Sequence, residues 1–410
     1  MAEKLADQPE NIAEKLAETV ADEPRAEFMF TDEQQELLAA VRRFCAENFD
    51  EQTVRRLMES DPPFDAKTWQ RLGTELGVLG LSVPEADGGV GGTLVDQAVA
   101  VEELGAALAC GPFFGTVYLA IPALVAASSS PVRDEVLAEL VEGRRTAAFA
   151  VRDRAGDLDT TVTVTATPAG EDWALSGTVE WVVDAGAADD LLVAAAGPNG
   201  LGLFVVDAAA AGVERTPLRT VDLTRPQATI SLSDAPARLV AGPDEAARVI
   251  SHALHVGAAL LATEQVGAAQ HILDVAVQYA KDRLQFGRPI GSFQAVKHRL
   301  ADMMVDLEHA RSTAYHAVWA LSEGSDDPAL AASIAQATCS AAFSRIAADA
   351  IQTLGGIGFT WEHQAHLYFK RATVDAALLG SAEEHRSRVA AMVLDTASPE
   401  KMPRIDDGTA

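Results

Sequence analysis

Two segments in the last third of the chain carry side chains that suit a charged ligand. In YAKDRLQFGRPIGSFQAVKHRLADM (279–303), Arg283 offers a planar fork of donors that fits a pyrophosphate, and Phe286 offers a flat apolar face. Gln294 begins the next helical run with an amide that can bond an amide or ribose edge. The alternative is a helix–turn–helix corner in which Arg283 pairs with a nearby carboxylate. Residue types alone favour that structural alternative, because arginines at helix ends are common.

The second segment is IQTLGGIGFTWEHQAHLYFKRA (351–372). Gln352 is followed by Gly355, Gly356 and Gly358, which leave bare backbone that a charged ligand can approach closely. A helix end with glycine caps explains the same residues equally well.

Glu264 stands alone in the otherwise apolar stretch LLATEQVGAAQ. A buried acid is costly unless it is paired or has a catalytic role, so this residue is either bonded to a partner helix or functional. From the sequence, a structural role for Glu264, bonded to a partner helix, is favoured over a catalytic role.

Composition excludes several classes of protein. The 410 residues are 48% hydrophobic and 22% charged, with a net charge of −28 that disfavours nucleic acids and anionic membranes as partners. No charge-free apolar stretch reaches about 18 residues, and the first residues do not form a secretory signal. Three distant cysteines indicate no disulfide pattern, no metal-ligand spacing and a cytoplasmic location. We expect neither a metal site nor a dinucleotide fingerprint of the Rossmann type.

Apolar periodicity divides the chain into helices, strands and helices again. We expect an N-terminal extension at 1–28, an N-terminal helical domain at 29–142 and a middle antiparallel β-sheet or barrel domain at 143–242. A C-terminal helical bundle at 243–397 and a polar tail at 398–410 follow, with helices near 245–285, from 292, at 329–354 and at 363–394. Thr31 and Gln34 form a predicted capping box at the start of the folded body. The predicted fold class is α+β.

Segments 279–303 and 351–372 together resemble the acyl-CoA dehydrogenase family, and the helix–sheet–helix order fits that family. Shorter matches are LGVLGLSVPEADGGVGG (76–92), VEWVVDAGAADDLLVAA (179–195) and VDLTRPQATISLSD (221–234). The resemblance covers about residues 28–395.

The resemblance implies an FAD-dependent reaction that introduces a trans double bond between the α and β carbons of an acyl-CoA thioester. In this family a carboxylate removes the α proton, the β hydride goes to the flavin, and the electrons pass to an electron-transferring flavoprotein. Relatives use the R-x-Q-F-G corner and the Q-x-x-G-G segment to contact the adenosine diphosphate half of FAD in a neighbouring subunit. Carried over, the resemblance names Arg283, Gln285, Phe286, Gln294, Gln352, Gly355 and Gly356.

The chain departs from the family where the base should be. Relatives carry this carboxylate either before a glycine late in the chain, where Leu379 stands here, or on the long helix at the position of Gly257. The substitutes are Glu264, one helical repeat beyond Gly257, and Glu383 and Glu384, which more often mark a solvated helix start.

The predicted flavin-ring side departs as well. Val151-Arg152-Asp153 replaces a usual Thr-Glu pair, and Trp181-Val182-Val183 replaces a Trp-x-Thr pattern. Trp181 could pack on a flavin or belong to the core. The residues expected to bind the diphosphate are therefore present in the sequence, whereas those expected to contact the flavin ring are replaced.

Three hypotheses follow. The first is one subunit of a heteromeric acyl-CoA dehydrogenase whose paralogous partner supplies the base, and the resemblance implies bulky sterol side-chain thioesters as its substrates. The second is a self-sufficient homotetramer with Glu264 as a displaced catalytic base. The third is a non-catalytic subunit that binds acyl-CoA or supports assembly.

Overall fold

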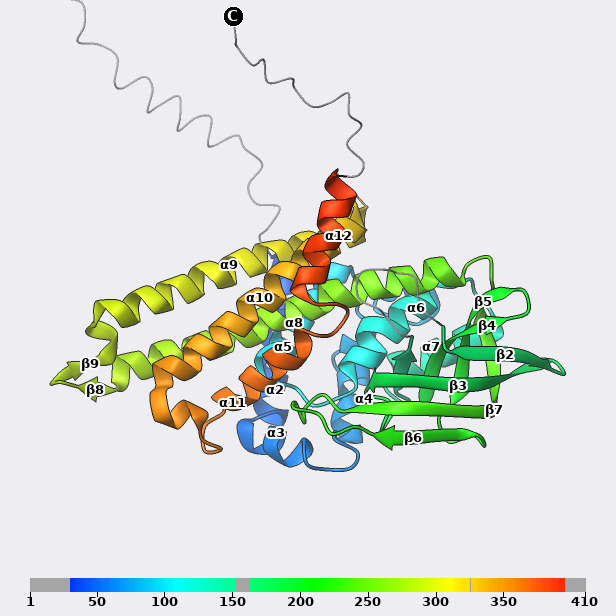
Figure 1. The fold of residues 1–410 in the computed structure, drawn as a ribbon, viewed down its shortest axis with the longest axis horizontal. Coiled ribbons are helices and arrows are strands. Elements are labelled where there is room, and N and C mark those ends of the chain that lie inside the picture. Colours follow the sequence, from blue (N-terminus) through cyan, green and yellow to red (C-terminus); the bar gives the residue numbers. More distant parts are fainter. Residues whose placement is uncertain (1–29, 152–161, 325, 395–410) are drawn as a thin grey trace, which may run out of the picture. The chain divides into compact units, whose positions relative to one another are not determined.

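The computed structural model describes residues 30–151, 162–324 and 326–394 (Figure 1). The predicted N-terminal extension and polar tail lie outside the described residues. The chain divides into two compact units, residues 1–36 and 37–410. In the first unit, the Gln34 N–H donates to the Thr31 hydroxyl over 3.2 Å and the Thr31 N–H donates to the Gln34 side chain over 3.1 Å. These reciprocal bonds confirm the predicted capping box.

Helices form the part of the chain before the sheet, as predicted. Apolar residues at helical spacing place Val41, Phe44 and Cys45 on one buried face, and Trp69 and Leu72 on another. The longer elements are α2 (Asp32–Asn48), α3 (Glu51–Leu57), α4 (Ala66–Thr74), α5 (Leu94–Ala106), the π-helix η3 (Phe114–Ala120), α6 (Ile121–Ala126) and α7 (Pro131–Val141).

The middle region is a seven-stranded sheet whose pairings close a ring. The strands are β1 (Ala147–Ala150), β2 (Val164–Ala169), β3 (Asp172–Val183), β4 (Asp190–Gly197), β5 (Gly200–Asp207), β6 (Val213–Pro217) and β7 (Gln227–Ala241). Strand β4 pairs with β2, β2 with β3, β3 with β7, β7 with β5, and β5 again with β4. Leu175, Leu191, Phe204 and Ile230 fill its apolar interior. The predicted sheet or small barrel is confirmed in this form.

Two strand contacts are parallel, which differs from a purely antiparallel sheet. Strand β1 pairs with β4 in parallel register from Ala147 opposite Asp190 to Ala150 opposite Val193, and Thr165 of β2 pairs with Ala196 of β4. The chain returns to β4 through the β2–β3 hairpin, and the described residues of this crossover form no helix. The parallel pairing of β1 with β4 was therefore not recognisable from helical patterns between predicted strands.

The C-terminal region is a helical bundle built on one long buried helix. The helices are α8 (Ala246–Asp282), α9 (Gln294–Glu323), α10 (Pro328–Leu354), α11 (Ala365–Asp375) and α12 (Ala382–Leu394). Helix α8 packs on α5, α9 and α10 (Figure 1). The single helix expected at 363–394 is instead two, because Leu379 and Gly380 adopt positive φ angles of 55° and 103° between α11 and α12.

Helix α8 is also long and apolar enough by composition to cross a membrane, with a mean hydropathy of 1.2 over 18 residues. Within that window, 72% is buried inside the protein. This is the pattern of a core helix.

Candidate active site

The corner between α8 and α9 presents Arg283, Gln285, Phe286 and Gln294 to solvent. Strands β8 (Leu284–Gln285) and β9 (Arg288–Pro289) form a tight hairpin there, and Phe286 turns it with a φ of 54°. The Phe286 ring is 91% exposed. Among the described residues, no carboxylate pairs with the Arg283 guanidinium, so the structure does not show the purely structural alternative.

The glycine segment follows α10. Gln352 is exposed on the last turn of that helix, and Gly355 leaves it with a φ of 66°. A Cβ atom at Gly355 or Gly356 would meet no atom within 4 Å, so the backbone is open to close approach. Their exposure allows a ligand to reach them from outside the chain.

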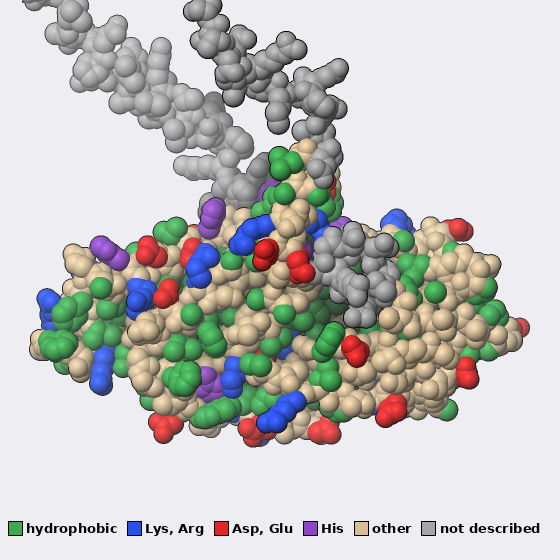
Figure 2. Space-filling model, in the orientation of Figure 1, with side chains coloured by type: hydrophobic (Ala, Val, Ile, Leu, Met, Phe, Trp, Pro, Cys, Tyr) green, Lys and Arg blue, Asp and Glu red, His purple; other side chains and the backbone are tan. Residues whose placement is uncertain are grey.

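Both predicted segments lie at the same end of the helical bundle. Helices α8 and α10 run in the same direction and finish there (Figure 1). Basic and hydrophobic side chains gather over the end that carries β8 and β9 (Figure 2). The structure thus places all seven predicted cofactor-binding residues, each of them exposed, at this end of the bundle.

The turn in which relatives carry the base is present between α11 and α12, but it holds a leucine in place of the carboxylate. Leu379 adopts a left-handed φ of 55°, which is unfavourable for a residue with a branched side chain, and its carbonyl lies 2.8 Å from His385 Nε2. Glu384 accepts bonds from the backbone and hydroxyl of Ser381 at the start of α12, and these bonds lower the pKa of Glu384. Glu383 is exposed in the same turn. The helix-start alternative therefore describes both acids.

Glu264 lies at the centre of a buried cluster of ion pairs. Arg225, in the loop before β7, donates to both Glu264 oxygens over 2.5 and 2.6 Å. Arg371 of α11 donates to Glu264 over 2.5 Å, and the Tyr118 hydroxyl of η3 donates over 2.8 Å. At most 5% of the Glu264, Arg225 and Arg371 side chains is exposed. The acid is therefore both buried and fully bonded.

Two further carboxylates complete this cluster. Asp222 accepts from Arg371 over 2.6 Å and from the Thr224 hydroxyl over 2.6 Å. Asp375 of α11 lies 3.3 Å from Arg225, yet neither of its oxygens has a hydrogen bond among the described residues. We call Asp222, Arg225, Glu264, Arg371 and Asp375 the buried ion cluster. It joins the loop before β7 to α8 and α11.

The buried ion cluster leaves little space around Glu264. The cavity beside it is about 10 Å³, which is about the volume for one water molecule. Opposing effects set the proton affinity of Glu264: burial raises its pKa, but Arg225 and Arg371 outweigh burial and lower it to about 2. A carboxylate held in this way is a weak base without room for a substrate. That Glu264 is the catalytic base stays a prediction.

Asp375 makes the stability of the chain depend on pH. Burial, reinforced by the charge of Glu264 and by Asp222 and opposed by Arg225 and Arg371, raises its pKa from 3.8 to about 7. The folded chain then holds a proton that the unfolded chain releases, so stability falls as pH rises from about 4 to 7. In Asp375→Asn, the amide stays uncharged at every pH and so mimics the protonated form of Asp375. We expect it to remove roughly 3 kcal/mol of the loss in unfolding free energy between pH 5 and pH 8 in urea titrations.

Asp184 provides the control for this prediction. It is buried, bonds the Gly115 N–H over 2.9 Å, and burial raises its pKa to about 6. Asp184 contributes to the pH dependence of stability below about pH 6. Asp184→Asn should therefore leave the fall in unfolding free energy between pH 6 and pH 8 in place. An unchanged fall in that interval in Asp375→Asn would show that Asp375 is not the group responsible.

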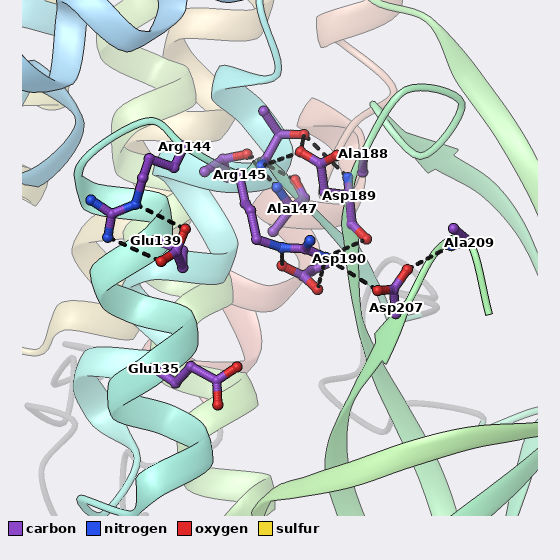
Figure 3. Close-up of polar contacts among 12 residues, drawn as sticks. Glu135, Glu139, Arg144, Arg145, Ala147, Ala188, Asp189, Asp190, Asp207 and Ala209 are labelled. Atoms are coloured by element: carbon purple, nitrogen blue, oxygen red, sulfur yellow. Dashed lines mark hydrogen bonds and ion pairs between the residues drawn. The ribbon is translucent and has the colours of Figure 1, made fainter.

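A larger cavity, of about 430 Å³, lies between α7 and the sheet (Figure 3). Both of its arginines are paired with carboxylates: Arg145 pairs with Asp190 over 2.7 Å, and Arg238 pairs with Glu135 over 2.9 Å. Arg144 pairs with Glu139 at its rim. These pairs stabilise the junction of α7 with the sheet, and none of the predicted site residues lies there.

On the predicted flavin-ring side, Trp181 is 61% exposed at a bulge of β3, with a φ of 54°. It is therefore not a core residue. Val183 is buried and offers no hydroxyl. Arg152 and Asp153 lie outside the described residues.

Sequence reasoning missed the partners of Glu264. Arg225 and Asp222 stand in the VDLTRPQATISLSD match, and Arg371 is the last residue but one of the 351–372 segment, but their joint role was not inferred. An arginine one helical turn after the buried Tyr368 was the available signal, because it places a cation on the buried face of a helix.

Comparisons with known proteins identify the family. The acyl-CoA dehydrogenase N-terminal domain matches residues 31–144 and the C-terminal domain matches residues 247–394. Acyl-CoA dehydrogenase IpdE2 of Mycolicibacterium smegmatis is 35% identical over 363 residues, covering 88% of this chain and 99% of the relative. The chain belongs to the acyl-CoA dehydrogenase family.

Solved structures of this family agree. A chain of the ChsE4-ChsE5 complex from Mycobacterium tuberculosis is 29% identical, with a TM-score of 0.82 over 91% of this chain and all of that chain. A chain of a Tcur3481-Tcur3483 steroid ACAD variant is 30% identical, with a TM-score of 0.79 over 89% of this chain and 98% of that chain. The predicted family, fold class and enzyme class, an oxidoreductase acting on CH–CH bonds, are confirmed.

The cofactor of these acyl-CoA dehydrogenases is FAD, and the chain's residues fit one half of it. The exposed Arg283 guanidinium, the Phe286 ring and the open backbone at Gly355 and Gly356 suit the charge and flat faces of an adenosine diphosphate group. The space around Glu264 is filled by the buried ion cluster instead.

Proposed function

We propose that this chain is one subunit of a heteromeric, FAD-dependent acyl-CoA dehydrogenase whose paralogous partner supplies the catalytic base. One observation carries the proposal: both positions where relatives hold the base lack a carboxylate, as Gly257 and Leu379, while the residues for a neighbour's cofactor are exposed. The ChsE4-ChsE5 complex and the Tcur3481-Tcur3483 steroid ACAD, each named for two proteins, support a partner of this kind.

Within the proposed enzyme, each part of this chain has a defined task. When bound, FAD would supply the acceptor for the β hydride of the thioester. Arg283 neutralises diphosphate charge, Phe286 covers an apolar face, and the backbone of Gly355 and Gly356 lets the ligand approach without steric conflict. The partner's carboxylate removes the α proton. Bulky sterol side-chain thioesters are the substrates we propose, with an electron-transferring flavoprotein as acceptor and the cytoplasm as location.

The self-sufficient alternative is less consistent with the geometry. Glu264 is bonded by two guanidiniums and a phenol, and the cavity that it lines is only about 10 Å³. A general base must reach the proton that it removes. The buried ion cluster supports a structural role for this acid.

Anaerobic flavin reduction by acyl-CoA tests the proposal. The chain should be co-purified with a paralogue that carries the carboxylate, and the flavin absorbance followed after mixing with a sterol side-chain thioester and with octanoyl-CoA. We expect reduction in the complex, and its loss when the paralogue's carboxylate is changed to the amide. Reduction that survives this change would show that the partner does not supply the base.

A further inference from the structure

We propose that His385 of α12 and His255 of α8 form a pH-sensitive latch, which holds α12 on the helical bundle and releases it as pH falls. The inference goes beyond the proposed function and does not depend on it. It concerns the junction of α12 with α8 and α10, which no step of the proposed reaction uses.

Helix α12 is attached to the bundle through a turn and one buried side chain. Leu379 and Gly380, just before the helix, both adopt positive φ angles. Among the residues Ala382–Leu394, all of which the structure describes, His385 alone is buried. A buried anchor is more often apolar, because an ionisable side chain must stay neutral or find a partner. The attachment of α12 therefore depends on a residue that can take up a proton.

The contacts of His385 favour its neutral form. Its Nε2 atom lies 2.8 Å from the Leu379 carbonyl oxygen, which can only accept, so Nε2 carries the proton. The Nδ1 atom is buried and has no hydrogen-bond partner among the described residues. A second proton would place a new N–H donor and a positive charge there without an acceptor. The docked position of α12 thus selects the neutral imidazole.

His255 faces the same small cavity as His385. Ser333 of α10 and Arg388 of α12 also line this cavity, whose volume is about 10 Å³. The Nε2 atom of His255 is buried, and it too has no hydrogen-bond partner among the described residues. A space of this size holds about one water molecule, which is too little water to solvate a buried imidazolium.

The surroundings of His385 disfavour its charged form on balance. Burial is the largest effect and lowers the pKa of His385, and Arg388 lowers it further. The Leu379 carbonyl and Glu384, at the start of α12, oppose this effect without reversing it.

The surroundings of His255 act in the same direction. Burial lowers the pKa of His255 to about 4, and Arg388, His252 and His385 add to that effect. Asp327, at the start of α10, is the acid that opposes it. The two histidines therefore discourage protonation of each other while α12 is docked.

Release of α12 would return both imidazoles to water, where their ordinary pKa is about 6.5. The released form then binds protons that the docked form excludes. The released fraction should therefore begin to rise as pH falls through about 6.5, and it should keep rising toward pH 4.

Hydrogen exchange of the full-length chain, read by mass spectrometry, tests the latch. After correction for the intrinsic effect of pH on amide exchange, opening of α12 should increase at least about fivefold from pH 7 to pH 5.5. Peptides from the buried helix α5 are the reference and should show no matching increase. No increase in α12, or an equal increase in α5, would overturn the proposal.

Glutamine variants identify the groups responsible. His385→Gln keeps an N–H donor for the Leu379 carbonyl but cannot titrate, so the rise in α12 opening should be smaller than in the parent. His255→Gln should reduce the rise as well, and the double variant should show less than about a twofold change. His309→Gln, at an exposed site on α9, should behave as the parent. A rise that is unchanged in both single variants would overturn the proposal, even if the double variant failed to dock α12.

Discussion

Glu264→Gln should lower the unfolding free energy by about 3–5 kcal/mol, because it removes one charge from a buried ion cluster. Arg225 and Arg371 would each lose a charged acceptor while staying buried, and the new amide would direct donors at their guanidiniums. Replacing one member of a buried pair is costly because the remaining charge has no water to solvate it. Urea unfolding of the purified chain measures the effect directly.

Glu135→Gln is the matched control for this experiment. Glu135 also pairs with an arginine, Arg238 at 2.9 Å, but 61% of its side chain is exposed. An exposed pair of this kind contributes about 0–1 kcal/mol. Equal losses in the two variants would contradict the structural role of Glu264. Abolished flavin reduction in a folded complex that contains Glu264→Gln would instead support its role as the base.

Arg283→Ala should weaken FAD retention in the heteromeric complex by about 10- to 100-fold, as expected when a charge-assisted bond to a diphosphate is removed. The side chain is exposed and has no ion-pair partner among the described residues, so the folded chain should keep its Tm. FAD affinity can be read by fluorescence titration of the stripped complex. Arg283→Lys should restore only part of the affinity, because an ammonium lacks the planar fork.

Arg71→Ala is the control for Arg283→Ala. Arg71 is a half-buried residue of α4 that pairs with Glu75 at the C-cap of that helix, away from the α8–α9 corner. The Arg71→Ala change removes the same charge without altering any of the predicted cofactor-binding residues. Equal FAD affinity in Arg283→Ala, Arg71→Ala and the parent complex would show that Arg283 does not hold the diphosphate.

The sequence was sufficient for the elements that depend on local patterns. Helical spacing of apolar residues predicts α8, α9 and α10, and a polar pair three residues apart predicts the Thr31–Gln34 capping box. The break at Leu379 was not predictable in this way, because leucine at a positive φ contradicts its own preference. The order of the strands around the ring was not predictable in this way either, since β5 and β7 pair although β6 lies between them in the sequence.

The same distinction between local and long-range patterns applies to the candidate site. Residues within one motif, such as Arg283 and Phe286, could be named because they lie close together in the sequence. The partners of Glu264 are 39 and 107 residues away, on a loop and on α11, so only the fold brings them together.

The flavin content of this chain, purified alone and together with a carboxylate-bearing paralogue, tests the central claim most directly. The account predicts little or no FAD on the folded chain alone, and FAD in the complex that is lost when Arg283 is changed to alanine. Stoichiometric FAD on the chain alone would contradict it, because a chain that completes its own flavin site needs no partner.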